Sequence, residues 1–439
     1  MLAAAAVPPL AVLALIATHA RNLPYWDHWG MVEFIVKATT GALRSSDLLE
    51  QLNEHRIIIP RMVMGGLAFL TKWDVRWELI VDFIVALATF ACLAGLIIRT
   101  VRPHAPALVP WLILVASLQT FSLAQGFGWT WGMQMPHYMS SLGAAASAWA
   151  LSRWNGRWTE TMLLLACSIW GALSCAAGLV LLGLVPLALL CMPAEITLRR
   201  RILHVLMTSV IAAVFIALYF KGWYPAIGQP KPVFAWSDTP QIARYFLAYH
   251  GGPFGPPTPP VAAWWGGAAL ATYVACTIWL WRRYPVYRRL VSTWSLLAAY
   301  VTANGVLTTY GRFGAGLQTA TIRRYLPAQS LFAVAVTAVV AVAVRHLLTR
   351  RPRLGMIAAA AVGLALLGIL RSSVPWWRSG IQIIRNHDRQ MAVASLCLHH
   401  CATTTDACFS LICWDPKVAR RFCPMIEEHR LGPFATSGG

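Results

Sequence analysis

The first hydrophilic segment of the chain follows an apolar stretch and combines carboxylate with imidazole side chains. Asp27 stands here between Trp26 and Trp29, and Glu54 and His55 follow a short distance on. Ionised groups beside a bilayer cost free energy unless they are hydrated, paired or bound to a metal. A carboxylate flanked by indole rings is partly desolvated, which suits a general base. The pattern predicts an active site with Asp27 as its base; the alternative is that Asp27 caps a helix.

The triplet Glu54, His55 and Arg56 offers ligands of two kinds. A carboxylate and an imidazole together suit a divalent cation such as Mg²⁺ or Mn²⁺, and a guanidinium matches the geometry of phosphate oxygens. We therefore predict catalytic and metal-binding roles for Glu54 and His55 and a substrate-binding role for Arg56. The alternative is a solvated start of a helix.

A later polar segment, residues 309–325, holds Arg312, Arg323, Arg324 and Tyr325 together with several glycines. Bidentate capture of a phosphate or pyrophosphate explains arginines at such a place, because the guanidinium fork fits these anions and glycines let a loop approach a ligand closely. The alternative is contact with lipid headgroups.

Residues 125–138 mix aromatic rings with amides and carry no formal charge. Flat rings and amides suit a sugar, so Trp129, Gln134 and His137 are predicted to bind substrate. The competing explanation is the aromatic belt that membrane proteins have at both interfaces.

Composition sets the class of the molecule. Hydrophobic residues make up 58% of the chain and charged residues 12%, and apolar runs of about 20 residues recur, as in helical polytopic membrane proteins. The net charge of +20 is spread over small basic groups between these runs, so nucleic acid is not an expected partner. We expect an all-α polytopic fold of about eleven transmembrane helices, near residues 2–19, 79–98, 105–124, 136–151, 160–175, 177–193, 202–220, 261–281, 290–308, 326–344 and 355–371.

The apolar run 57–71 is left out of this set. It contains Pro60 and Arg61 and is too short to cross about 30 Å of hydrocarbon, so we expect a juxtamembrane helix there. All five basic connections then fall on one side, which the positive-inside rule makes cytoplasmic together with the N-terminus. The sequence therefore predicts a multi-pass protein of a bacterial inner (plasma) membrane, with periplasmic segments 20–77, 221–260 and 309–325 and a periplasmic C-terminal tail, 373–439.

The tail is rich in cysteine: five of the ten cysteines lie in it. An oxidising compartment favours disulfides, and an odd number leaves one thiol over. Zinc is the rival explanation because His399 and His400 lie inside the cluster, but the spacings match no common zinc module.

Four features follow one another along the chain: an acidic residue directly after the first helix, a surface helix at 53–61, a second helix opened by Trp73 to Glu78, and an aromatic outer loop. This order resembles the GT-C superfamily of integral-membrane glycosyltransferases. The resemblance implies a GT-C-like catalytic domain over 1–372 and a sugar donor carried on polyprenyl phosphate. It implies that Asp27 is the base, that Glu54 and His55 support it or bind metal, and that Arg324, with Arg323 or Arg312, holds the donor phosphate. The superfamily often has paired acids after helix one, whereas this chain has Asp27 and His28.

The expected reaction is an inverting sugar transfer to a lipid or glycan acceptor on the periplasmic face, beside membrane lipids, with a divalent cation as the only expected cofactor. One alternative is a polysaccharide polymerase or ligase of the cell envelope that relies on outer-loop arginines. Another is a flippase or transporter of lipid-linked sugars, which should carry ionisable groups inside its spanning helices. The expected spans are nearly free of charge apart from Asp82, which disfavours transport.

Overall fold

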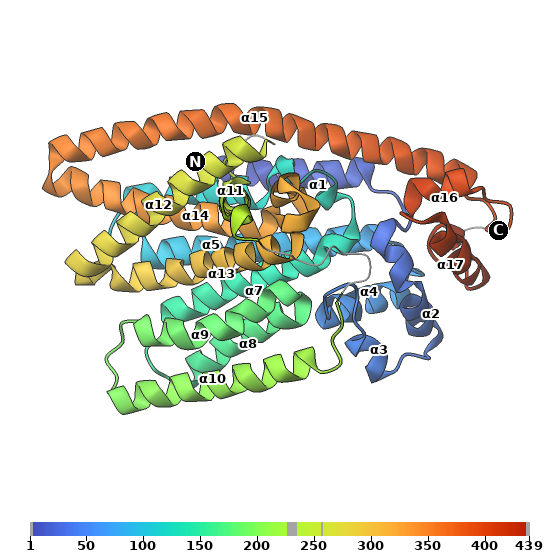
Figure 1. Cartoon of the computed structure of the whole chain (residues 1–439), viewed down its shortest axis with the longest axis horizontal. Coiled ribbons are helices and arrows are strands. Elements are labelled where there is room, and N and C mark those ends of the chain that lie inside the picture. The colour runs from blue at the N-terminus through green and yellow to red at the C-terminus, as the bar shows by residue number, and fades with distance from the viewer. Residues whose placement is uncertain (1–2, 226–234, 256–257, 436–439) are drawn as a thin grey trace.

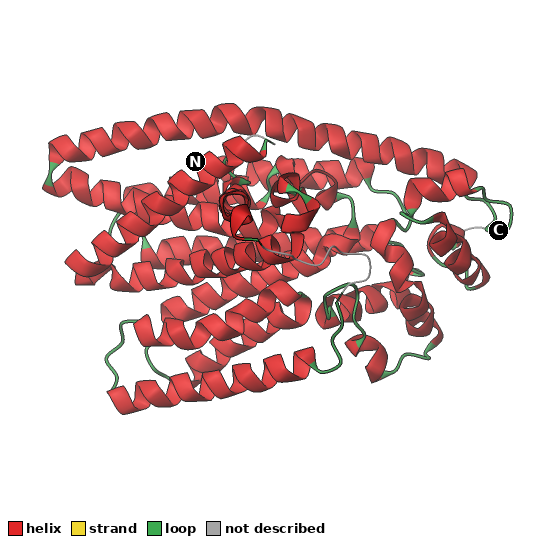
Figure 2. Cartoon of the chain, in the orientation of Figure 1, coloured by secondary structure: helices red, strands yellow, loops and turns green. Residues whose placement is uncertain are grey.

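The computed structural model describes residues 3–225, 235–255 and 258–435. Over these ranges the chain is all-helical and forms no strand, as Figure 2 shows. One isolated bridge joins Leu52 and His55. The prediction of an all-α protein is therefore confirmed. Part of the segment 221–260, namely 226–234 and 256–257, lies outside the described residues.

The helices have the following bounds: α1 (Val7–His19), α2 (Val32–Thr40), α3 (Ser45–Leu49), α4 (Ile58–Thr71), α5 (Arg76–Thr100), α6 (Val109–Thr120), α7 (Met135–Arg153), α8 (Trp158–Ser174), α9 (Leu179–Cys191), α10 (Leu198–Phe220), α11 (Thr239–Gly251), α12 (Pro259–Arg283), α13 (Arg288–Arg312), α14 (Leu326–Arg350), α15 (Pro352–Cys397), α16 (Asp406–Ile412) and α17 (Pro416–Glu428). Three short 3₁₀ turns matter for the site: η2 (Trp26–Met31), η4 (Leu123–Trp129) and η11 (Arg323–Tyr325).

Six helices of the described chain are long and apolar enough to span a membrane, and they include α5, α10, α12 and α15. The other two run over Pro285–Ala315 and Arg323–Arg350, and a seventh span arises if α6 and η4, bent by 44°, count as one. The chain is thus a helical membrane protein, but eleven spans are not confirmed, because the helices at the other expected spans are shorter or less apolar. Helix α4 has 14 residues, about 21 Å, and is shorter than a span.

Most of the long helices lie side by side, and the connections between α9 and α10, α12 and α13, and α14 and α15 lie at one end of the molecule (Figure 1). These connections carry the basic clusters. Helices α2, α3, α4, α16 and α17 gather at the opposite end. The core has two main parts: one between α5, α7, α9, α13 and α14, and another that joins the first hydrophilic segment to the tail.

Helix α15 differs most from expectation. It runs unbroken for 46 residues, about 69 Å, so it crosses the predicted boundary at 372 and extends far beyond a membrane span. The helix passes so close to η4 that a Cβ atom on Gly380 would meet the Leu123 carbonyl oxygen at 1.8 Å. Further along, Asp388 pairs with His19 at 3.0 Å and with Arg21 at 2.6 Å. The long helix is therefore fixed to the C-terminal end of α1.

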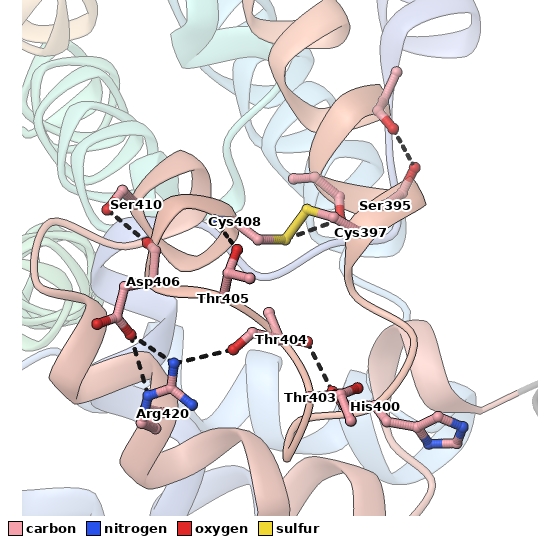
Figure 3. The surroundings of a disulfide bond; sticks show 12 residues. Ser395, Cys397, His400, Thr403, Thr404, Thr405, Asp406, Cys408, Ser410 and Arg420 are labelled. Carbon is pink, nitrogen blue, oxygen red and sulfur yellow. Dashed lines mark hydrogen bonds and ion pairs between the residues drawn. A yellow bond between two sulfur atoms is a disulfide. The ribbon is translucent and has the colours of Figure 1, made fainter.

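The tail packs onto the first hydrophilic segment. Trp29 donates from Nε1 to the Ile412 carbonyl at 3.2 Å, and the Gly432 amide donates to the Lys72 carbonyl at 2.8 Å. Disulfides join Cys397 to Cys408 and Cys401 to Cys423, and Cys413 stays free and buried. Figure 3 shows the first of these bonds beside the pair of Asp406 with Arg420, which links α16 to α17. The expectation of disulfides with one thiol left over is confirmed.

Removing the second disulfide should release the tail. In the variant Cys401→Ala with Cys423→Ala, the loop between them loses its constraint, which we expect to destabilise the tail by about 2–4 kcal/mol. Limited trypsin digestion should then cut at Arg420 and Arg421 faster than in the wild type. Cys413→Ala is the control, since this free thiol constrains no loop. Equal digestion rates for the double variant and the wild type would contradict the prediction.

Candidate active site

The turn η2 presents Asp27, and His28 anchors this turn. His28 accepts a hydrogen bond on Nδ1 from the Tyr25 amide at 3.1 Å, so its Nε2 carries the proton and donates to Glu78 of α5 at 2.9 Å. Both side chains of this pair are buried. The residue before Asp27, Trp26, has a φ of +50°, a strained left-handed backbone for a bulky side chain. The contacts of His28 thus hold the turn in place.

The carboxylate of Asp27 is half-buried and has no hydrogen bond or ion pair within the described part of the chain. The start of η2 receives no side-chain hydrogen bond from it, and neither does the start of α2. The alternative role as a helix cap is therefore not supported. Burial raises the pKa of Asp27, while Arg324 and His28 act against that rise. A carboxylate that is partly desolvated and unengaged has the properties of a general base.

A tight turn brings the second group of candidates to Asp27. The backbones of Leu52 and His55 exchange hydrogen bonds at 2.8 and 2.9 Å, and Asn53 has a φ of +51° between them. Asn tolerates this conformation better than most residues. Trp223, after α10, donates from Nε1 to the Glu54 carbonyl oxygen at 3.2 Å. The turn is thus held from both sides, and both Glu54 and His55 come within electrostatic reach of Asp27.

Glu54 bridges two of the predicted groups. Its carboxylate forms an ion pair with Arg312, and His55 Nε2 lies 3.7 Å from the same oxygen. On its other side, His55 Nδ1 lies 4.0 Å from the sulfur of Cys175. Burial acts to lower the pKa of His55, but the Cys175 sulfur and the Glu54 carboxylate outweigh it and raise the pKa above its ordinary value.

The two neighbouring arginines of η11 have different surroundings. Arg323 donates to the Ala124 carbonyl and, at 2.9 Å, to the Ser379 hydroxyl, and its guanidinium lies 3.9 Å from the centre of the Trp376 ring. Arg324 has a buried Nε without a hydrogen-bond partner. It acts electrostatically on Asp27 and on Tyr325, and Tyr325 is hydrogen-bonded to Arg312. Arg323 is committed to packing, whereas Arg324 faces the site.

The remaining predicted residues also divide into members of the site and residues committed to structure. His137, near the start of α7, lies within electrostatic reach of His55, Arg312 and Arg324, so it belongs to the cluster. Trp129 is 1% exposed and donates to the Ser122 carbonyl, and Gln134 is 3% exposed, so both belong to the core.

Arg56 is also committed to structure. It donates from Nε to the Tyr219 carbonyl at 2.9 Å and from Nη2 to the Lys221 carbonyl at 2.7 Å, so it ties this segment to the end of α10.

The site does not supply a set of ligands that suits a divalent cation. Among the described residues, no group of three or more His, Cys, Asp or Glu side chains is arranged to hold a metal ion. Glu54 is held by a guanidinium, and further cationic side chains surround it. These donors do not fit the oxygen-rich shell that Mg²⁺ requires, and we derive no step through a cation.

Taken together, Asp27, Glu54, His55, His137, Arg312, Arg324 and Tyr325 form one cluster at the end of the bundle where the first hydrophilic segment lies; this cluster is called the Asp27 site below. The cluster joins two arginines and a histidine to two carboxylates. The Arg324 Nε without a partner suits an anion, and the Asp27 carboxylate suits the removal of a proton. The sequence offered no signal for Cys175, which resembled the other cysteines of apolar helices. Comparison of the chain with protein-family profiles, curated proteins and solved structures finds no match.

Proposed function

We propose that this protein is a membrane glycosyltransferase that moves a sugar from a polyprenyl-phosphate donor to a lipid or glycan acceptor on the periplasmic face of a bacterial inner membrane. One observation carries the proposal: Asp27 has an unengaged, half-buried carboxylate beside Arg324, whose Nε lacks a partner. The first group suits proton removal, and the second suits an anion.

The proposed reaction is an inverting displacement. Asp27 takes the proton of the acceptor hydroxyl as its oxygen attacks the anomeric carbon, and the bond from that carbon to the phosphate oxygen breaks. The departing polyprenyl phosphate carries away the bonding electrons, and Arg324, with Arg312 and His55, stabilises the charge on it. Glu54 supports this step by holding Arg312. No nucleotide takes part.

Analysis of the cell envelope of a strain that lacks the protein tests the proposal. Mass spectrometry of surface glycans and glycolipids should show the loss of one sugar increment, and wild-type protein should restore it. Protein with Asp27→Asn, shown by immunoblot to reach the membrane, should not. An unchanged set of glycans after deletion would overturn the proposal. Full restoration by Asp27→Asn would instead favour a polymerase or ligase that relies on arginines, or a transporter.

A further inference from the structure

A cavity lies at the opposite end of the molecule from the Asp27 site. It has a volume of about 770 Å³ and lies between the α7–α8 connection, the end of α9, the start of α10 and the junction of α12 with α13. This volume falls in the range of ligand pockets, about 300–1,000 Å³. The surrounding connections carry the basic clusters, so the positive-inside pattern predicts that this end is cytoplasmic.

Positive charge dominates the lining of this cavity. Arg201, Arg288 and Arg289 line it together with one acidic residue, Glu195. None of the three arginines forms an ion pair with a carboxylate in the described part of the chain. Glu195 offsets one of these three charges, so positive charge is in excess in the lining.

The arginines differ in how far the protein already uses them. Arg289 donates from Nη1 to the Ser152 and Trp154 carbonyls, each at 3.0 Å, and Arg201 donates from Nη1 to the Met192 carbonyl at 2.6 Å. These bonds fix both guanidinium groups at helix ends. Arg288 donates only from Nε, to the Trp281 carbonyl at 3.3 Å. Both terminal nitrogens of Arg288 therefore remain available for a bidentate contact with a phosphate.

Exposed apolar side chains also lie next to the cavity. Leu190 of α9, beside the lining residue Cys191, is 49% exposed, and Leu198 at the start of α10 is 71% exposed. A soluble phosphate compound would leave these side chains in water, whereas acyl chains would cover them. We propose that this cavity binds the phosphate headgroup of an anionic phospholipid of the cytoplasmic leaflet, with Arg288 as the main contact. This inference does not depend on the function proposed for the Asp27 site.

Lipid titration of the purified full-length protein in detergent tests the proposal. Phosphatidylglycerol should raise the thermal unfolding temperature more than phosphatidylcholine does. Arg288→Gln should weaken the apparent affinity for phosphatidylglycerol about tenfold, through loss of a direct charge-assisted contact with the phosphate. Arg282→Gln is the matched control, because Arg282 is exposed on the same end and does not line the cavity, and it should leave the affinity unchanged.

Glu195→Gln gives a test of opposite sign that holds even if Arg288→Gln fails to fold: removal of the only acid in the lining should strengthen binding of phosphatidylglycerol. No gain with Glu195→Gln, or equal effects of Arg288→Gln and Arg282→Gln, would overturn the proposal. Inorganic phosphate should produce no stabilisation that depends on Arg288. If it does, the ligand is a soluble phosphate, and the assignment to a lipid is wrong.

Discussion

Asp27→Asn is expected to lower kcat of the purified protein about 10²- to 10⁴-fold, the usual contribution of a general base. Asparagine keeps the size of the side chain but cannot take a proton. The assay follows transfer of a radiolabelled sugar from a polyprenyl-phosphate donor. The sugar is the one found to be missing from the envelope of the deletion strain. Glu33→Gln is the matched control: Glu33 lies in the same segment on α2, 3.6 Å from Arg421, and outside the Asp27 site.

The pH dependence of the activity should identify Asp27 as the group that takes up the proton. Burial raises the pKa of Asp27, so activity should fall on acidification at a higher pH than expected for an ordinary carboxylate, as Asp27 takes up a proton. The ionised Asp27 lowers the stability of the fold, whereas an ionised acid in a salt bridge raises it. A carboxyl whose pKa is raised by folding costs stability at every pH above its ordinary pKa, because the unfolded chain ionises first. Asp27→Asn should therefore unfold at the same temperature as the wild type or higher at neutral pH. Lost activity together with lowered stability would point to a structural role instead.

The sequence pattern was sufficient to predict an all-helical membrane protein and to predict that several candidate residues lie at one end of it. Apolar runs that alternate with basic connections predict helices whose ends lie on the same two sides of a membrane. Polar segments far apart in the chain then share one end of the bundle. For this reason residues as distant as Asp27, Glu54, Arg312 and Arg324 could be grouped before their contacts were known. The strained backbone at Trp26 carries no sequence signal of its own.

Features that depend on a particular partner could not be predicted in this way. Pro375 resembles the end of a helix, yet α15 continues, because its C-terminal half packs on η4 and binds the segment after α1 through Asp388. Cys175 is one of several cysteines in apolar helices, and only its neighbour His55 gives it a place at the site. The predicted number of spans is not confirmed for another reason: an apolar sequence indicates burial, and helices buried among other helices need not be long enough to cross a bilayer.

The adjacent pair Arg323 and Arg324 gives the sharpest test of what the contacts add to the sequence. Both have the same charge and lie on the same turn, yet the guanidinium of Arg323 is held by Ala124, Ser379 and Trp376, while the Nε of Arg324 has no partner. Arg324→Gln should lower kcat/KM about 10- to 100-fold through loss of a charge-assisted bond to phosphate, worth about 1.5–3 kcal/mol. The unfolding temperature should change little, because Arg324 forms no hydrogen bond or ion pair in the described part of the chain.

Arg323→Gln should show the reverse pattern: a lower unfolding temperature, because η4 separates from α15, with a smaller loss of kcat/KM in the protein that stays folded. Arg324→Lys should recover part of the activity, since it restores the charge but not the bidentate fork. Steady-state kinetics and thermal unfolding of the three variants separate the two roles. If Arg323→Gln and Arg324→Gln lose equal activity at equal stability, both arginines hold the donor phosphate, and the contacts of Arg323 must open when the donor binds.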